Sequence, residues 1–140
     1  MFNDFLAARG IAKPYTDADY FAYVDGKPRY EGVASFLASR GIELPVGRAS
    51  DIPETDSVCG LGNRKNEYFN HVLARDGIAP YPGSLRLLDH LAAIELPMAV
   101  VSSSRNAEAV LDAAGLVDYF AVVMDGNLGH RLGLPGKPAP

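Results

Sequence analysis

Two stripes of apolar residues at helical spacing precede position 80, and each ends at a glycine, Gly41 or Gly77. The first stripe consists of Val33, Phe36 and Leu37, and the second of Tyr68, Phe69, Val72 and Leu73. A glycine suits the left-handed position that follows the end of a helix. Thr16 and Asp17 resemble the capped start of a shorter helix with acids in its first turn. The pattern therefore predicts a helical region up to about Pro80.

Downstream of Tyr81-Pro82-Gly83, whose Pro-Gly pair is a turn signal, the pattern alternates between helix and strand. Ser84 is the expected N-cap of a first helix. That helix is expected to bury Leu87, Leu88 and Leu91. The apolar runs 98–101 and 120–124 have the composition of buried strands, and a helical stripe over 107–114 separates them. This order is typical of a parallel sheet with crossover helices, so we predict an α/β fold for the second region.

Two strands alone make an incomplete sheet, because each would be an edge with unpaired backbone groups. Phe2–Gly10 has the pattern of the last turns of a helix that ends at a glycine, and Pro138-Ala139-Pro140 has that of an approach to another element. We therefore expect that the chain is truncated at both ends and that the rest of the sheet lies outside this sequence. We also expect exposed apolar surface and a tendency to associate.

The charge and composition exclude several classes of function. The net charge is -4 and Lys and Arg form no stripe, which argues against a nucleic-acid surface. The apolar stretch Leu96–Val101 is far shorter than the roughly 20 residues that cross a bilayer, and Met1 opens no secretion signal, so we expect a cytoplasmic protein without a membrane partner. Cys59 is alone, which excludes an internal disulfide and favours a small buried hydrophobe. The three histidines are scattered, and no metal-ligand set is predicted.

Three serines, Ser102, Ser103 and Ser104, follow the first predicted strand and precede a predicted helix. Unpaired backbone N–H groups, the helix dipole and serine hydroxyls favour an anion at such a place. The same serines are equally consistent with simple capping of the helix. The spacing alone leaves both interpretations open.

Val100–Asn106, together with Gly136-Lys137-Pro138-Ala139-Pro140, resembles the second and third motifs of the haloacid dehalogenase superfamily, and most closely its β-phosphoglucomutase-like branch. The resemblance implies that Ser102 and Lys137 are catalytic, with Ser102 binding the transferring phosphoryl group and Lys137 neutralising its charge. It implies that Ser103, Arg105 and Asn106 line the phosphate or substrate. It also implies a helical cap domain over residues 1–80 and a partial Rossmann-like parallel-sheet core over residues 81–140.

Basic residues extend both apolar stripes of the first region, since Arg29 lies four residues before Val33 and Lys65 four before Phe69. Such positions face inward or toward a cleft. The resemblance implies that Gly26, Lys27, Arg29 and Lys65 bind the substrate from the cap, and that the arginine and lysine hold the non-reacting phosphate of a small phosphorylated sugar. The alternative is that both side chains extend from a helix end into water.

The superfamily's nucleophile, the first aspartate of an Asp-x-Asp-Gly motif, does not occur in the 140 residues. Tyr23-Val24-Asp25-Gly26 and Val123-Met124-Asp125-Gly126 lack the first acid, and Asp17-Ala18-Asp19 lacks the glycine. The resemblance implies Mg²⁺ for the complete enzyme, with ligands outside this chain. The expected function is that of β-phosphoglucomutase, which interconverts β-glucose 1-phosphate and glucose 6-phosphate through a phosphoaspartate, but inactive in this chain. A sugar-phosphate phosphatase and a non-catalytic phosphate-binding fragment remain as alternatives.

Overall fold

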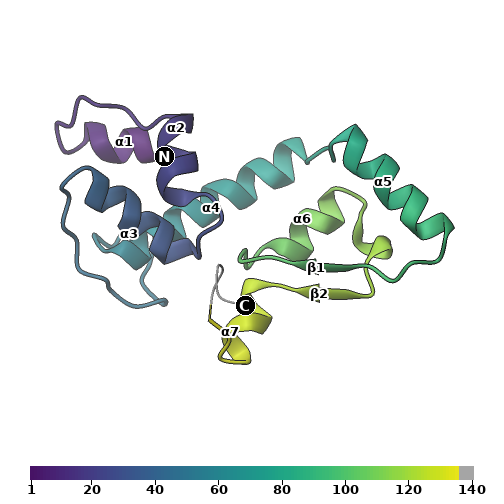
Figure 1. Cartoon of the computed structure of the whole chain (residues 1–140). Coiled ribbons are helices and arrows are strands. Elements are labelled where there is room, and N and C mark those ends of the chain that lie inside the picture. The colour runs from purple at the N-terminus through teal and green to yellow at the C-terminus, as the bar shows by residue number, and fades with distance from the viewer. Residues whose placement is uncertain (136–140) are drawn as a thin grey trace. The chain divides into compact units, whose positions relative to one another are not determined.

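The computed structural model describes residues 1–135, which form two compact units (Figure 1). The first unit is Met1–His71 and the second begins at Val72. The boundary lies within one helix, ahead of the turn near Pro80 at which we predicted a change of domain. The first unit is helical and the second contains the sheet, as the two periodicities predicted.

Helices form the first unit. They are α1 (Phe2–Ala7), α2 (Asp17–Asp19), the π-helical turn η1 (Tyr20–Val24), α3 (Arg29–Ser39) and α4 (Val58–Asp76), whose last residues belong to the second unit. Thr16 caps α2 as predicted, because its hydroxyl accepts from the Asp19 N–H while the Asp19 carboxylate accepts from the Thr16 N–H. Gly41 and Gly77, which follow α3 and α4, have φ of 65° and fill the left-handed cap positions.

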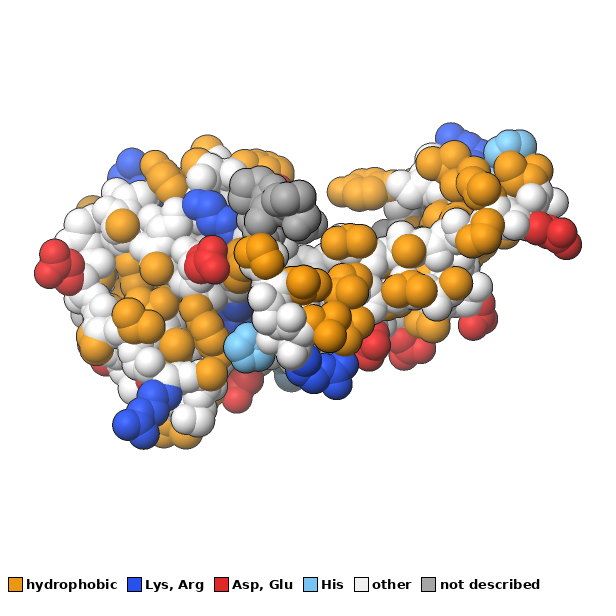
Figure 2. All heavy atoms as spheres, turned by 60° about the horizontal axis from the view of Figure 1, so that its bottom comes forward, with side chains coloured by type: hydrophobic (Ala, Val, Ile, Leu, Met, Phe, Trp, Pro, Cys, Tyr) orange, Lys and Arg blue, Asp and Glu red, His pale blue; other side chains and the backbone are white. Residues whose placement is uncertain are grey.

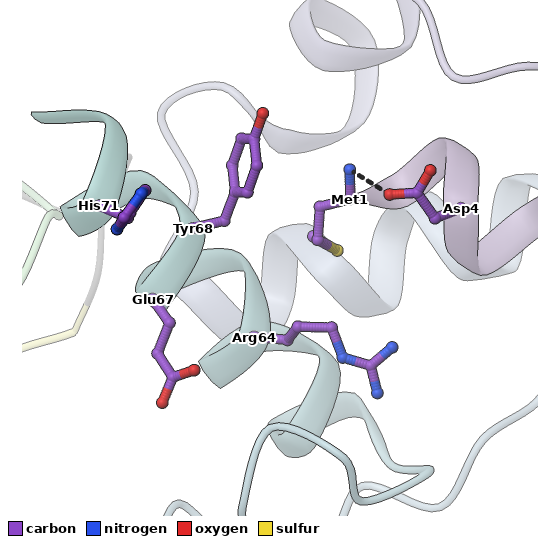
Figure 3. Close-up of a pocket in the computed structure, with 6 residues that line it drawn as sticks. All are labelled: Met1, Asp4, Arg64, Glu67, Tyr68 and His71. Carbon is purple, nitrogen blue, oxygen red and sulfur yellow. Dashed lines mark ion pairs between the residues drawn. The ribbon is translucent and has the colours of Figure 1, made fainter. Parts of the chain in front are cut away.

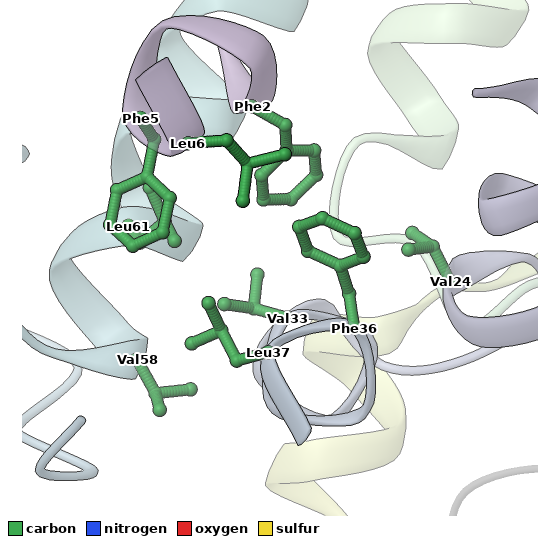
Figure 4. Packing of buried hydrophobic residues seen from close by; sticks show 9 residues of the cluster. All are labelled: Phe2, Phe5, Leu6, Val24, Val33, Phe36, Leu37, Val58 and Leu61. Atoms are coloured by element: carbon green, nitrogen blue, oxygen red, sulfur yellow. The ribbon is translucent and has the colours of Figure 1, made fainter. Parts of the chain in front are cut away.

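The core of the first unit lies between α1, α3 and the start of α4 (Figure 4). Phe36 is fully buried, and its ring centroid lies 4.8 Å from that of Phe2 and 4.9 Å from that of Tyr15. Beside this cluster, Arg40 forms an ion pair of 2.8 Å with Asp19, and both side chains are nearly buried. The buried apolar residues of the core are Phe2, Phe5, Leu6, Val24, Val33, Phe36, Leu37, Val58 and Leu61.

The buried part of α4 is its beginning rather than the stripe at residues 68–73. Ser57 starts the helix, since its hydroxyl accepts from the Gly60 N–H at 2.9 Å. Val58–Gly62 are buried, whereas Tyr68 is 59% exposed and the other members of the predicted stripe are half-buried. The predicted helical spacing of residues 68–73 is confirmed by α4. Periodicity identifies one face of a helix without showing how far along the helix a partner covers it.

The second unit contains α5 (Pro82–Ala93), β1 (Ala99–Val101), α6 (Ala107–Ala113), the 3₁₀ turn η2 (Val117–Tyr119), β2 (Val122–Met124) and α7 (Gly126–Arg131). The strands are parallel, and Ala99, Val100 and Val101 pair with Val122, Val123 and Met124. Because α6 connects them, the predicted crossover arrangement is confirmed. Both strands are shorter than the apolar runs from which they were predicted.

Helix α5 begins at Pro82, with Tyr81 as its N-cap, so the prediction that Ser84 caps it was wrong. Proline at the first helical position has the φ of a helix and lacks the N–H that would otherwise need a partner, so the helix starts three residues earlier than predicted. The predicted burial of Leu87 was also wrong, since this side chain is 57% exposed.

Hydrophobic side chains remain exposed on the second unit, as we expected from an incomplete sheet. Val101 on β1 is 66% exposed and Val122 on β2 is 52% exposed. Figure 2 shows hydrophobic side chains on the surface of this unit. Among its described residues, Ala107 and Asp125 are the buried ones. No helix within residues 1–135 combines the length and apolar character needed to cross a membrane.

Candidate functional site

The serine loop, residues 102–106, connects β1 to α6 in the second unit. The Ser102 N–H donates to the Met124 carbonyl at 2.9 Å, which joins the start of the loop to the end of β2. The Ser104 N–H donates to Ser102 Oγ, and the Asn106 N–H donates to Ser104 Oγ, both at 3.1 Å. The hydroxyl oxygens therefore shape the loop as acceptors, while each hydroxyl hydrogen can still donate to a ligand.

The turn that leads from β2 into α7 forms hydrogen bonds with this loop. The Gly126 N–H donates to the Ser104 carbonyl at 3.0 Å, and Asn127 Nδ2 donates to the Arg105 carbonyl at 2.9 Å. A Cβ on Gly126 would lie 2.5 Å from the Ser103 carbonyl oxygen, so only glycine allows this approach. The turn fixes the backbone of the loop from a segment more than twenty residues later in the chain.

Asp125 organises that turn. Its carboxylate is buried and accepts from the N–H groups of Asn127 at 3.0 Å and Leu128 at 2.7 Å, which caps α7. Burial by itself would raise the pKa of Asp125, but the hydrogen bonds from Leu128 and Asn127 outweigh it and lower the pKa. Sequence reasoning considered Asp125-Gly126 only as an incomplete nucleophile motif. The overlooked signal is an N-cap residue directly after a strand.

The structure brings four predicted phosphate-binding residues together on the loop, namely Ser102, Ser103, Arg105 and Asn106. Each is half-buried, and Asn106 is the N-cap residue of α6 without a side-chain bond to the helix. The bonds that Ser102 and Ser104 accept are local bonds to backbone N–H groups before α6, and binding of an anion by this loop stays a prediction. Lys137, the predicted catalytic lysine, lies outside the described residues.

In the first unit, Arg29 begins α3 and points its guanidinium toward α4. Its Nη2 donates to Asn66 Oδ1 at 2.7 Å, and its Nη1 to Asn63 Oδ1 at 3.4 Å. Lys65, on the same stretch of α4, is half-buried. Burial lowers the pKa of Lys65, and the positive charge of Arg29 lowers it further. The structure thus brings together the two basic residues that we predicted to face a common anion.

Gly26 and Lys27 form the turn between η1 and α3. Gly26 has φ of 71°, a conformation that favours glycine, and both residues are exposed. Lys27 Nζ donates to Ser35 Oγ at 2.7 Å, so in this structure the lysine lies along α3. The asparagines beside Arg29 were missed by sequence reasoning, because an asparagine inside a helix carries no signal of a partner elsewhere in the chain.

A depression with a volume of about 470 Å³ lies between α1 and α4 of the first unit (Figure 3). It is lined by Met1, Asp4, Arg64, Glu67, Tyr68 and His71, and so by none of the predicted site residues. The Met1 ammonium forms an ion pair of 3.0 Å with Asp4 there. Within residues 1–135, no three His, Cys, Asp or Glu side chains gather in a group that could hold a metal ion.

Known proteins resemble the chain over its full length. It is 42% identical to a Mycobacterium bovis protein named β-phosphoglucomutase, in an alignment that covers 100% of the chain and 56% of that relative. An uncharacterised glycosyl hydrolase of Mycobacterium tuberculosis is 39% identical over 91% of the chain, which is 9% of that much longer protein. No protein-family model matches the chain. The chain spans about half the length of the β-phosphoglucomutases that it matches.

A solved structure supports the same relationship at the level of the fold. A Thermotoga maritima protein provisionally assigned as β-phosphoglucomutase aligns with 91% of the chain, at a TM-score of 0.54 and 22% identity, over 52% of its own length. At this identity the likeness concerns the fold, a helical cap with part of a parallel-sheet core. The resemblance indicated by the motifs is therefore confirmed, and the chain is similar throughout to the β-phosphoglucomutase-like branch of the haloacid dehalogenase superfamily.

Proposed function

We propose that this chain carries the cap and the phosphate-binding loop of a sugar-phosphate phosphotransferase of the β-phosphoglucomutase type. The observation that supports this most is the 42% identity over the full chain to a protein of that name. The serine loop and the Arg29–Lys65 pair then have separate tasks. The loop binds the reacting phosphoryl group, and the pair binds the phosphate at the other end of the sugar.

The geometry of the serine loop supports its part in this proposal. The loop is preorganised by its own hydroxyls and by Gly126 and Asn127, so little ordering is needed when an anion binds. Lys137, which follows Gly136 in the sequence, is proposed to neutralise charge on the bound phosphoryl group. Positioning and charge neutralisation supply most of the catalysis in phosphoryl transfer.

A second phosphate-binding site, formed by Arg29 and Lys65, favours a mutase over a simple phosphatase. A mutase must hold a bisphosphate intermediate by its non-reacting end, whereas a phosphatase that acts on monophosphates has no such need. Arg29 and Lys65 are suited to that task, because two neighbouring positive charges are an unfavourable arrangement that a bound anion relieves. A sugar-phosphate phosphatase is the alternative.

The 140 residues contain no Asp-x-Asp-Gly, and the described part of the chain has no candidate group of metal ligands. Mg²⁺, the cofactor that this fold family implies, therefore does not fit the side chains of residues 1–135. We propose that the chain as printed binds sugar phosphates without turning them over. In this chain, the proposed role of the cap and the serine loop is to bind the sugar phosphate.

Calorimetric titration of the 140-residue chain tests this proposal. We expect glucose 1,6-bisphosphate to bind about tenfold more tightly than glucose 6-phosphate, since a charge-assisted hydrogen bond contributes about 1.5–3 kcal/mol. Arg29→Ala should remove most of that difference, and Ser102→Ala should weaken both ligands. Equal affinity of the wild-type chain for both sugars would contradict the binding of a second phosphate by Arg29 and Lys65. Release of phosphate in the presence of Mg²⁺ would contradict the absence of a nucleophile.

A further inference from the structure

Arg105 lies against the turn formed by residues 125–127, which connects β2 to α7. Its carbonyl oxygen accepts from Asn127 Nδ2 at 2.9 Å. A Cβ on Gly126 would lie 3.2 Å from both the backbone nitrogen and Cγ of Arg105, so the first part of the arginine side chain lies close to this glycine. The turn therefore sets both the main chain of Arg105 and the direction in which its side chain leaves the loop.

The side-chain amide of Asn127 is held in one orientation. Its Nδ2 donates to Asp125 Oδ2 at 2.8 Å as well as to the Arg105 carbonyl. Because the pKa of Asp125 is lowered, its carboxylate is ionised at neutral pH and can only accept, as can a carbonyl oxygen. The amide nitrogen must therefore face both acceptors. The position of the Arg105 main chain is linked through Asn127 to the carboxylate of Asp125.

The two carboxylate oxygens of Asp125 make different bonds. Oδ1 accepts from the N–H groups of Asn127 and Leu128 and caps α7, whereas Oδ2 accepts from the Asn127 side chain. Capping alone does not require an aspartate, because asparagine and serine are equally good N-cap residues. A buried negative charge is also unfavourable beside a loop that binds an anion. The bond made by Oδ2 explains the carboxylate, since an asparagine here offers one acceptor oxygen and not two.

We propose that Asp125 and Asn127 are positioning residues, which place Arg105 so that its side chain contacts the phosphoryl group bound by the serine loop. Asp125 orients the Asn127 amide, and Asn127 holds the main chain of Arg105. This role rests on the proposed function, in which the serine loop binds the reacting phosphoryl group. It gives the two residues an effect on the affinity for phosphate without contact with the phosphate.

Sulfate titration of the 140-residue chain, followed by the amide chemical shifts of residues 102–106, tests this role. Asp125→Asn keeps an oxygen that can cap α7 but turns an N–H group toward the Asn127 amide, so the bond between the two side chains is lost. We expect this change to weaken sulfate binding about tenfold, although the loss of a negative charge alone would strengthen it. Asp118→Asn is the matched control, because it removes the same charge at an exposed position of η2 and should not weaken binding.

A second comparison shows whether Asn127 acts through Arg105. Asn127→Ala keeps the main-chain N–H groups that bond to Asp125, so α7 retains its cap. We expect this change to weaken sulfate binding about tenfold in the wild-type chain and less than about twofold in the Arg105→Ala chain, since both changes remove the same contribution. An equal loss of affinity in both chains would refute the action through Arg105.

Two outcomes separate this role from the function on which it rests. If Ser102→Ala weakens sulfate binding while Asp125→Asn and Asn127→Ala bind sulfate like the wild type, the positioning role is refuted and the proposed loop site stands. If sulfate leaves the amide shifts of residues 102–106 unchanged in the wild-type chain, the loop site and the positioning role both fail. If Asp125→Asn also loses the amide signals of α7, Asn127→Ala decides, and wild-type affinity in that variant refutes the role.

Discussion

Replacing Gly62 by alanine tests the packing that supports Arg29. In an exposed helix this change stabilises a protein by up to about 1 kcal/mol, because glycine is the more flexible residue in the unfolded chain. Here the new methyl group would lie 2.8 Å and 3.1 Å from two carbons of the Tyr30 ring. Carbon atoms in favourable contact lie about 3.5–4.0 Å apart, so the ring must move.

The free energy lost by moving the Tyr30 ring exceeds the free energy gained by placing alanine in the helix. Overpacking of this kind costs about 1–3 kcal/mol. A shift of the ring also strains the hydrogen bond from the Tyr30 hydroxyl to Asn63, which contributes about 1 kcal/mol. With the helical gain subtracted, we expect Gly62→Ala to lower the free energy of unfolding of the first unit by about 1–3 kcal/mol.

Thermal unfolding followed by circular dichroism measures this effect. For a unit of this size the loss corresponds to a drop in melting temperature of at least about 4 °C. Gly32→Ala in α3 is the matched control, since its Cβ would meet Val24 at 3.4 Å, an ordinary contact, and we expect it to be neutral or stabilising. A Gly62→Ala chain that melts at or above the temperature of the Gly32→Ala chain would refute the close approach of α3 and α4.

Two further predictions concern Lys65 and Gly126. Because the pKa of Lys65 is lowered in the folded chain, the unfolded state binds its proton more tightly, and the stability of the first unit should rise with pH between that lowered pKa and the ordinary value of 10.5. Urea unfolding at several alkaline pH values should show this rise in the wild type and not in Lys65→Met; a rise of equal size in both would exclude Lys65 as its source. Gly126→Ala, whose Cβ would lie 2.5 Å from the Ser103 carbonyl oxygen, should weaken sulfate binding at the serine loop about tenfold. Gly129→Ala in α7, with open space around its Cβ, should not weaken it, and equal affinity in both variants would contradict the support of the loop by Gly126.

Local signals predicted much of the fold. Glycines at 41 and 77 end their helices in the left-handed conformation, and Thr16 forms its capping box, because each of these features depends on a few neighbouring residues. The parallel pair β1 and β2 followed from two apolar runs with a helical stripe between them. The helical stripe that includes Tyr68 lies in α4 as predicted, but its spacing did not show that the partner covering α4 reaches only the first turns of the helix.

In the candidate site, too, residues within local motifs could be predicted and residues that depend on distant contacts could not. Ser102 and Arg29 could be singled out from motifs, because their neighbours in sequence carry the resemblance. The residues that hold them could not, since Asn63 meets Tyr30 across thirty-three positions and Asn127 meets Arg105 across twenty-two. Such pairs are brought together by packing, and a single sequence contains no record of which distant side chains will meet.

The uneven burial of the two units has a consequence for the energetics of the chain. Apart from Ala107, every buried apolar side chain in residues 1–135 belongs to the first unit. Amide hydrogens of α3 should therefore exchange with solvent only when that unit opens as a whole, whereas the three-residue strands of the second unit open in small local fluctuations. The two units then differ in local stability. The more stable first unit carries Arg29 and Lys65, and the less stable second unit carries the serine loop.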